Sequence, residues 1–126
     1  MSQTSTAKTD ALLAQIKAFG LRYPDANIRS PWPEHGDLAV RDKTFAWLSI
    51  EGQPFSIGLK LPFTGPEVLE LPYAKPTGYG LGRSGWVTLT PGEHELPDMG
   101  RLKAWIDESY RAVAPKSLIK AIPPLD

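Results

Sequence analysis

Three runs of strand-forming residues follow one another in the middle of the chain, and only two or three residues separate each run from the next. The runs cover 38–41, 44–51 and 55–61, and they are rich in β-branched and aromatic side chains. A parallel connection needs a crossover of a dozen or more residues, so linkers this short allow only antiparallel pairing. The sequence therefore predicts an antiparallel sheet built from consecutive hairpins.

The third run alternates between apolar and small or polar residues. Ile57, Leu59 and Leu61 fall on one face of a strand, whereas Ser56, Gly58 and Lys60 fall on the other. This alternation is typical of an antiparallel sheet that is covered on one side only. We therefore expect Lys60 to face solvent or a partner.

Segments with helical periodicity occur before and after the three strand runs. We expect helices over 9–23, 64–71 and 98–114, and a final helical turn over 116–122. Thr9 and Asp98 are favourable N-cap residues, and Pro24, Pro72 and Pro115 end the three helices because the residue before a proline avoids the helical region.

A further strand is expected at 86–90, and a short edge strand near Ile28. The resulting fold class is α+β: a two-layer sandwich in which an antiparallel sheet carries its helices on one face. We predict one domain over 9–122, with a disordered N-terminal tail at 1–8 and a C-terminal tail at 123–126.

Composition excludes several classes of function. The chain of 126 residues has no cysteine, so disulfides, zinc ribbons and thiol catalysis are ruled out. There is no apolar stretch long enough for a membrane span and no signal-peptide core, so we expect a cytoplasmic protein without membrane contact. The 14 basic residues balance 14 acidic ones, so nucleic-acid binding would require a local basic patch.

A glycine motif at 80–87 matches the pattern G-x-G-x-x-G-x-V. In a dinucleotide site a helix follows the glycines and holds the pyrophosphate, whereas here a strand follows. The other kinase motifs are absent from the sequence. We interpret 76–85 as a flexible loop that leads into the strand at Trp86 and leaves Arg83 exposed.

The two histidines, His35 and His94, are about sixty residues apart and lack metal-ligand spacing. No serine lies in a nucleophile elbow. We therefore expect no metal, no cofactor and no catalytic residues, and hence a protein that is not an enzyme.

The four tryptophans are further candidates for a binding site. Trp47 in mid-strand and Trp105 on the apolar side of the last long helix are expected in the core. Trp86 fits either a core or a ligand-binding position. Trp32, between two prolines, is the candidate exposed anchor, with packing of its loop onto the sheet edge as the alternative.

Basic residues are concentrated toward the C-terminus. Between 99 and 122 the chain has five basic residues and two acidic ones. Lys60, Lys75 and Arg83 would enlarge this group if the fold brought them close to it. The alternative is a solvated helix face.

Several short motifs resemble the MmcQ/YjbR family. These are Tyr23-Pro24, the K-x-F-A-x-L segment at 43–48, Leu59-Lys60, Gly85-Trp-Val-Thr-Leu, and Ser109-Tyr110 on the last long helix. The resemblance covers about residues 9 to 120. It implies a fold similar to bacterial frataxin (CyaY), in the arrangement described for this family as a double wing, and a DNA-binding role assigned largely by analogy. Where members often have an Asn-Lys pair this chain has Arg83-Ser84-Gly85. Its first helix offers only Asp10 toward frataxin-like iron binding, so iron is not expected.

Two functional hypotheses follow. The first is weak, salt-dependent and mostly sequence-independent binding of nucleic acid such as DNA. Phosphates would meet Lys60, Lys75, Arg83, Arg101, Lys103 and Arg111, and bases would stack on Trp32, Tyr79 or Trp86. The alternative is a protein- or small-ligand-binding module, with the Trp32 loop and the glycine-rich loop 76–85 as the walls of a cleft. The edge strand near Ile28 allows a monomer or a weak dimer.

Overall fold

A computed structural model describes residues 2–30, 36–78 and 80–123. Its elements, in chain order, are α1 (Ser2–Gly20), β1 (Ala26–Arg29), β2 (Asp37–Val40), β3 (Lys43–Leu48), β4 (Ile57–Lys60), α2 (Gly65–Val68), β5 (Ala74–Pro76), the 3-10 helix η1 (Leu81–Ser84), β6 (Trp86–Leu89), α3 (Met99–Val113) and α4 (Lys116–Lys120).

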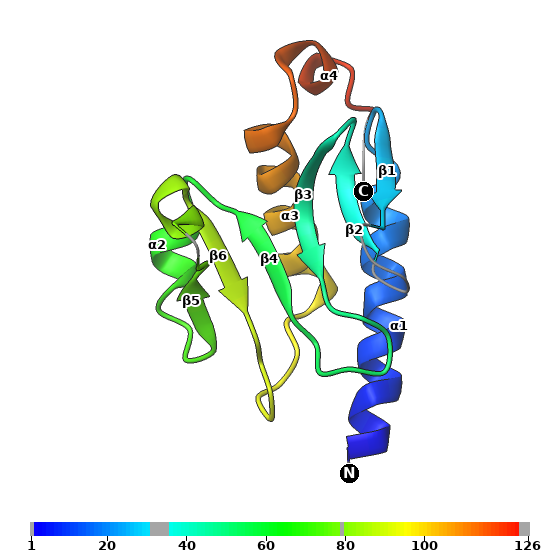
Figure 1. The fold of residues 1–126 in the computed structure, drawn as a ribbon, viewed down its shortest axis with the longest axis vertical. Helices are drawn as coiled ribbons and strands as arrows, with labels where there is room; N and C mark the ends of the chain where they lie inside the picture. Colours follow the sequence, from blue (N-terminus) through cyan, green and yellow to red (C-terminus); the bar gives the residue numbers. More distant parts are fainter. Residues whose placement is uncertain (1, 31–35, 79, 124–126) are drawn as a thin grey trace.

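The strands form one antiparallel sheet in the order β1-β2-β3-β4-β6-β5. Both α1 and α3 lie on one face of it, α2 lies beside β6, and α4 lies at one end (Figure 1). Among the described residues no helix covers the opposite face. The predicted α+β sandwich with helices on one face is confirmed, and the alternation in β4 has the expected cause, since Ile57 and Leu59 are fully buried against the helices.

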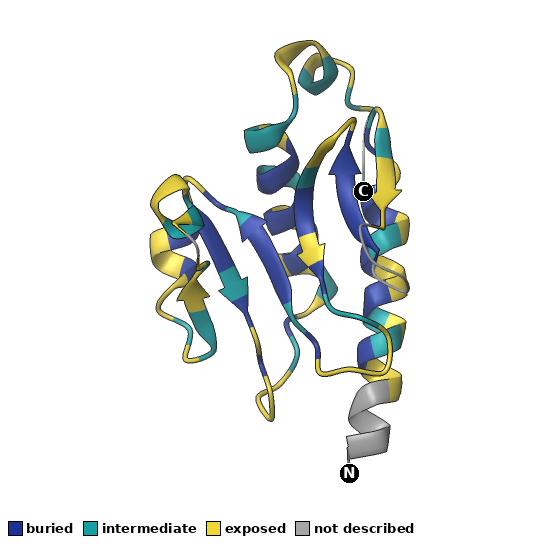
Figure 2. Ribbon diagram, in the orientation of Figure 1, coloured by how far each residue is buried: buried dark blue, intermediate teal, exposed yellow. Residues whose placement is uncertain are grey.

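The core lies between the sheet and the two long helices. Its largest fully buried members include Ile16 from α1, Leu59 from β4, and Leu102 and Ile106 from α3. Figure 2 shows this as dark blue on the helix and strand surfaces that face one another. Trp105 is 6% exposed, so the prediction that it belongs to the core is confirmed.

An aromatic cluster fixes α3 to the sheet. The Tyr110 ring lies edge-on to Phe45, with ring centroids 5.2 Å apart, and 4.6 Å from the ring of Tyr23. The Tyr110 hydroxyl donates to the carbonyl of Pro24 at 2.6 Å, and Tyr23 donates to the carboxylate of Asp107 at 2.6 Å. The segment after α1 is thereby tied to the last long helix.

Several elements differ from the prediction, among them the segment 76–85, which was interpreted as a flexible loop but begins in β5 and contains η1. The helix α1 begins at Ser2 instead of Thr9, since residues 2–8 contain neither proline nor glycine to stop it. The predicted helix over 64–71 is a single turn, α2, followed by hydrogen-bonded turns up to Leu71. The short strand β5 was not predicted at all, and it forms by pairing with β6.

Candidate functional site

The uncovered face of the sheet presents a row of side chains across four strands. Trp47 on β3 pairs with Gly58 on β4, Gly58 pairs with Thr88 on β6, and Thr88 pairs with Lys75 on β5. Residues paired across antiparallel strands point to the same face. Lys60 pairs with Trp86 two residues along the same strands, so both also point to the uncovered face.

A β-bulge in β3 decides which aromatic side chain reaches this face. Leu38 pairs with Ala46 while the next residue, Ala39, pairs with Thr44, so Phe45 is an extra residue in the ladder. Phe45 and Trp47 would share a face in a regular strand. The bulge turns Phe45 into the core, where it is fully buried, and leaves Trp47 on the opposite face.

Trp47 is 40% exposed, so the prediction that it belongs to the core was wrong. The bulge is the physical reason, because Phe45 takes the core position. Gly58 provides the space for the indole: a Cβ atom at this glycine would lie 3.3 Å from Cδ1 of Trp47. The Trp47 ring can therefore lie close over β4 and still present surface to solvent.

The ladder between β3 and β4 ends at the bulge, with Ala46 and Leu59 as its last pair. Beyond this pair the two strands diverge (Figure 1). The side chain of Ser109, from α3, fills the gap between them. Its hydroxyl donates to the carbonyl of Phe45 at 2.6 Å and accepts from the N–H of Lys60 at 2.8 Å. Ser109 thus replaces the missing backbone pairing and holds the strands apart.

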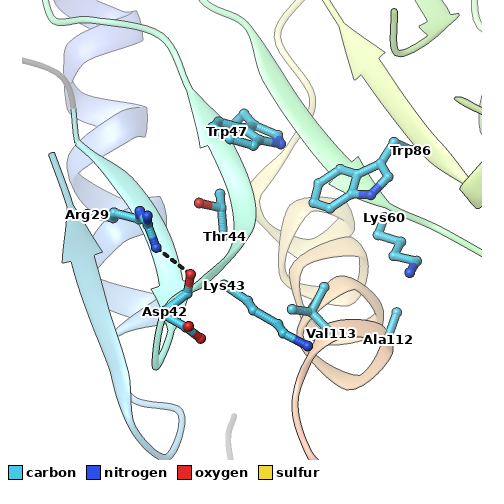
Figure 3. Close-up of a pocket in the computed structure, with 9 residues that line it drawn as sticks. All are labelled: Arg29, Asp42, Lys43, Thr44, Trp47, Lys60, Trp86, Ala112 and Val113. Atoms are coloured by element: carbon cyan, nitrogen blue, oxygen red, sulfur yellow. Dashed lines mark hydrogen bonds between the residues drawn. The ribbon is translucent and has the colours of Figure 1, made fainter. Parts of the chain in front are cut away.

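An open pocket of about 630 Å³ lies over this divergence (Figure 3). Its lining residues come from β1, β3, β4, β6, the β2–β3 turn and the end of α3. They are Arg29, Asp42, Lys43, Thr44, Trp47, Lys60, Trp86, Ala112 and Val113. The two tryptophans lie on one side of the pocket, and Ala112 and Val113 add an apolar surface opposite them.

The charge of the pocket is positive. Arg29, Lys43 and Lys60 contribute three cations against the single carboxylate of Asp42. The Arg29 guanidinium donates to the backbone carbonyl of Asp42 rather than to a carboxylate (Figure 3). Within the described ranges, neither lysine forms an ion pair. An anionic ligand would therefore meet cations that no described carboxylate neutralises by direct contact.

The aromatic part of the pocket has one exposed and one covered ring. The centroids of Trp47 and Trp86 are 6.4 Å apart, and the ring planes are tilted by 55°. Trp86 is only 8% exposed, so it acts as a wall, whereas Trp47 offers a flat surface on which another ring can stack.

The six basic residues predicted from the sequence do not form one patch. Lys60 lines the pocket, Lys75 lies on the same face at the β5 edge, and Arg83 is exposed on η1. The other three belong to α3, on the helical side of the sheet, and each has a neighbour there. Arg101 lies over the Trp105 ring, Lys103 lies over the Phe19 ring, and Arg111 forms an ion pair with Asp107 at 2.7 Å.

Of the predicted stacking residues, Trp86 lines the pocket, whereas Trp32 and Tyr79 lie outside the described residues. Sequence reasoning missed Arg29, Lys43 and the position of Trp47 in the lining of the pocket. The one signal for Trp47 lay in the alternation of β4, where Gly58 on the polar face leaves room for a large neighbour.

The tyrosines of the aromatic cluster are structural. Burial, together with the hydrogen bond to Asp107, raises the pKa of Tyr23 far above its ordinary value. Burial and the negative charge of Asp25 also raise the pKa of Tyr110. Both hydroxyls therefore stay protonated at neutral pH and act as hydrogen-bond donors.

The described part of the chain contains no cluster of three or more potential metal ligands. His94 contacts the Tyr73 ring with centroids 5.4 Å apart, and both line a second, smaller pocket with Glu95, Asp98 and Arg101. His35 lies outside the described residues. Across those same ranges, no helix is long and apolar enough to cross a membrane.

The fold defines the class of the protein: a small α+β domain with one antiparallel sheet and its long helices on one face. The family model YjbR matches residues 21–112, and the chain belongs to this family. The family membership expected from the sequence motifs is thus confirmed. No curated protein matches the chain.

A solved structure supports the fold. The crystal structure of the Deinococcus radiodurans protein DR2400, with the family-model domain DUF419, is similar with a TM-score of 0.67 and 22% sequence identity. The match covers 87% of this chain and 86% of the other. At this identity the similarity concerns the fold.

Proposed function

We propose that this protein binds single-stranded nucleic acid, weakly and without strong sequence preference, in the pocket on the uncovered face of the sheet. The observation that carries the proposal is the convergence of Trp47, Trp86 and three cations around one open pocket. A stacking ring beside cations is the combination that recognises a base and its phosphate.

The form of the pocket favours single strands over duplex. A base in a duplex is stacked on both faces, whereas a base in a single strand can place one face on the Trp47 ring. The basic residues of α3 give a weaker case for duplex binding, because Arg101 and Lys103 already lie over aromatic rings and Arg111 is paired with Asp107.

The affinity should be modest and strongly dependent on salt. The chain has no net charge, so the attraction comes only from the local cations. For three phosphate contacts on a single strand, log K should fall with log salt with a slope of about −2. Replacing Lys43 or Lys60 should reduce the steepness of that slope by about 0.7.

The test is a titration of labelled oligothymidylate, and of a duplex of the same length, at two salt concentrations. Trp47→Ala should weaken binding by about 5-fold or more, because stacking contributes about 1–3 kcal/mol per base. Arg101→Ala is the matched control on the helical side and should leave the affinity unchanged. Absence of binding at low salt, or equal losses in both variants, would contradict the proposal.

A small anionic ligand is the second candidate. The volume of about 630 Å³ and the apolar contribution of Ala112 and Val113 suit a compact molecule with a flat ring and an acidic group. A mononucleotide that binds as tightly as an oligonucleotide would favour this candidate. For both candidates we propose a non-catalytic role without a cofactor, and a monomer or weak dimer in the cytoplasm.

A further inference from the structure

Phe63 is the most exposed large apolar side chain among the described residues. It is 85% exposed, in the turn that connects β4 to α2. A phenylalanine held in water contributes nothing to the core, and an exposed aromatic ring on an ordered turn is a typical binding anchor.

The backbone of this turn is held firmly by α3. The carboxylate of Glu108 accepts hydrogen bonds from the N–H of Phe63 at 2.7 Å, from the N–H of Thr64 at 3.1 Å and from the Thr64 hydroxyl at 2.8 Å. A ring on a backbone that is already ordered loses little entropy when it binds.

The turn lies near residues of the pocket, both along the chain and across the sheet. Lys60, a pocket residue, precedes Phe63 by three residues, and the N–H of Leu61 donates at 2.8 Å to the carbonyl of Gly85, the neighbour of Trp86. On α3, Glu108 lies one helical turn before Ala112, which lines the pocket. Figure 1 shows the turn after β4 at the same end of the sheet as the start of β6.

We propose that Phe63 is a second stacking position, and that it receives a nucleotide further along the strand whose first base lies on Trp47. This inference rests on the proposed nucleic-acid binding. Three residues span at most about 10 Å even when fully extended, so Phe63 is within reach of a strand whose phosphate contacts Lys60. The binding site then extends over at least two nucleotides, with Lys60 between the two rings.

The test compares two probes of different length, thymidine monophosphate and an oligothymidylate of about eight nucleotides. Phe63→Ala should weaken binding of the oligonucleotide by about 5-fold or more and leave binding of the mononucleotide unchanged. Phe63→Trp keeps an aromatic ring at this position and should bind the oligonucleotide as tightly as the wild type does. Leu21→Ala removes a 44% exposed apolar side chain beyond the end of α1 and serves as the matched control.

Each outcome separates the two proposals. If Trp47→Ala weakens both probes and Phe63→Ala weakens neither, the pocket binds nucleotides and the second stacking position is wrong. If wild-type protein binds neither probe at low salt, the proposed function itself fails. Light scattering on the wild type and Phe63→Ala provides a further check: loss of a dimer in the variant, with oligonucleotide binding intact, would assign Phe63 to self-association and overturn the inference.

Discussion

Ser109→Ala should destabilise the protein more than any ordinary serine substitution, because one hydroxyl satisfies backbone groups on two diverging strands. Ser109 is fully buried, with short hydrogen bonds to the carbonyl of Phe45 and the N–H of Lys60. Alanine cannot replace either bond. Each buried polar group left without a partner costs about 1–3 kcal/mol, so the expected loss is on the order of 2–4 kcal/mol.

The measurement is urea unfolding followed by tryptophan fluorescence. A loss of about 3 kcal/mol lowers the urea midpoint by about 1–3 M for a domain of this size. Ser49→Ala is the matched control, because the Ser49 hydroxyl accepts one half-buried hydrogen bond, from the N–H of Ser56 at 3.1 Å. We expect that control to lose about 1 kcal/mol or less.

Equal midpoints for Ser109→Ala and Ser49→Ala would refute this reasoning. That result would mean that β3 and β4 close together without the hydroxyl, and that the strands pair directly between Phe45 and Lys60. The pocket above the gap would then narrow, and nucleotide binding by Ser109→Ala would fall although its stability did not.

Further predictions concern the glycines under large side chains and the buried tyrosines. Gly58→Ala should displace the Trp47 indole, because the new Cβ would lie 3.3 Å from it, and weaken oligonucleotide binding with a small change in the unfolding midpoint. Gly20→Ala places a Cβ 2.5 Å from Cδ1 of Leu38 in the core, so thermal unfolding should show a loss of about 1–3 kcal/mol with binding retained. The raised pKa of Tyr23 means that the folded state keeps a proton that the unfolded state releases, so the contribution of Tyr23 to the free energy of unfolding should be constant below a pH of about 10 and fall as the pH rises above it. Tyr23→Phe should make that alkaline fall less steep in urea titrations at several pH values.

Local sequence patterns predicted the hairpins and the two layers, because both features depend on residues that are close together in the chain. The short turns force antiparallel pairing, and Ile57 and Leu59 show which side of β4 is covered. The strand β5 was not predicted because its three residues end in Pro76 and have no apolar pattern of their own. Proline is tolerated there because β5 is an edge strand, and pairing with β6 creates the element.

The candidate site depended on two features that lie outside any local pattern. The bulge at Phe45 reverses the expected face of Trp47, and nothing within the segment 43–48 distinguishes a bulged from a regular strand. The pocket also joins Arg29 to Lys60 and Val113, which are far apart in the chain. A count of charges along the sequence instead placed the predicted basic patch largely on α3, whose basic side chains lie on the helical side of the sheet.

A chain without net charge can still present a cationic pocket when its carboxylates are held elsewhere by structural contacts. On the helical side the carboxylates have structural partners: Asp98 caps α3 through the N–H of Arg101 at 2.8 Å, Asp107 binds Tyr23 and Arg111, and Glu108 holds the turn at Phe63. These contacts keep three negative charges at α3, behind the sheet. Lys43, Lys60 and Arg29 then dominate the pocket with only Asp42 against them. The positive charge of the pocket is therefore local, and a binding assay with Lys43→Ala and Lys60→Ala would measure how far binding depends on it.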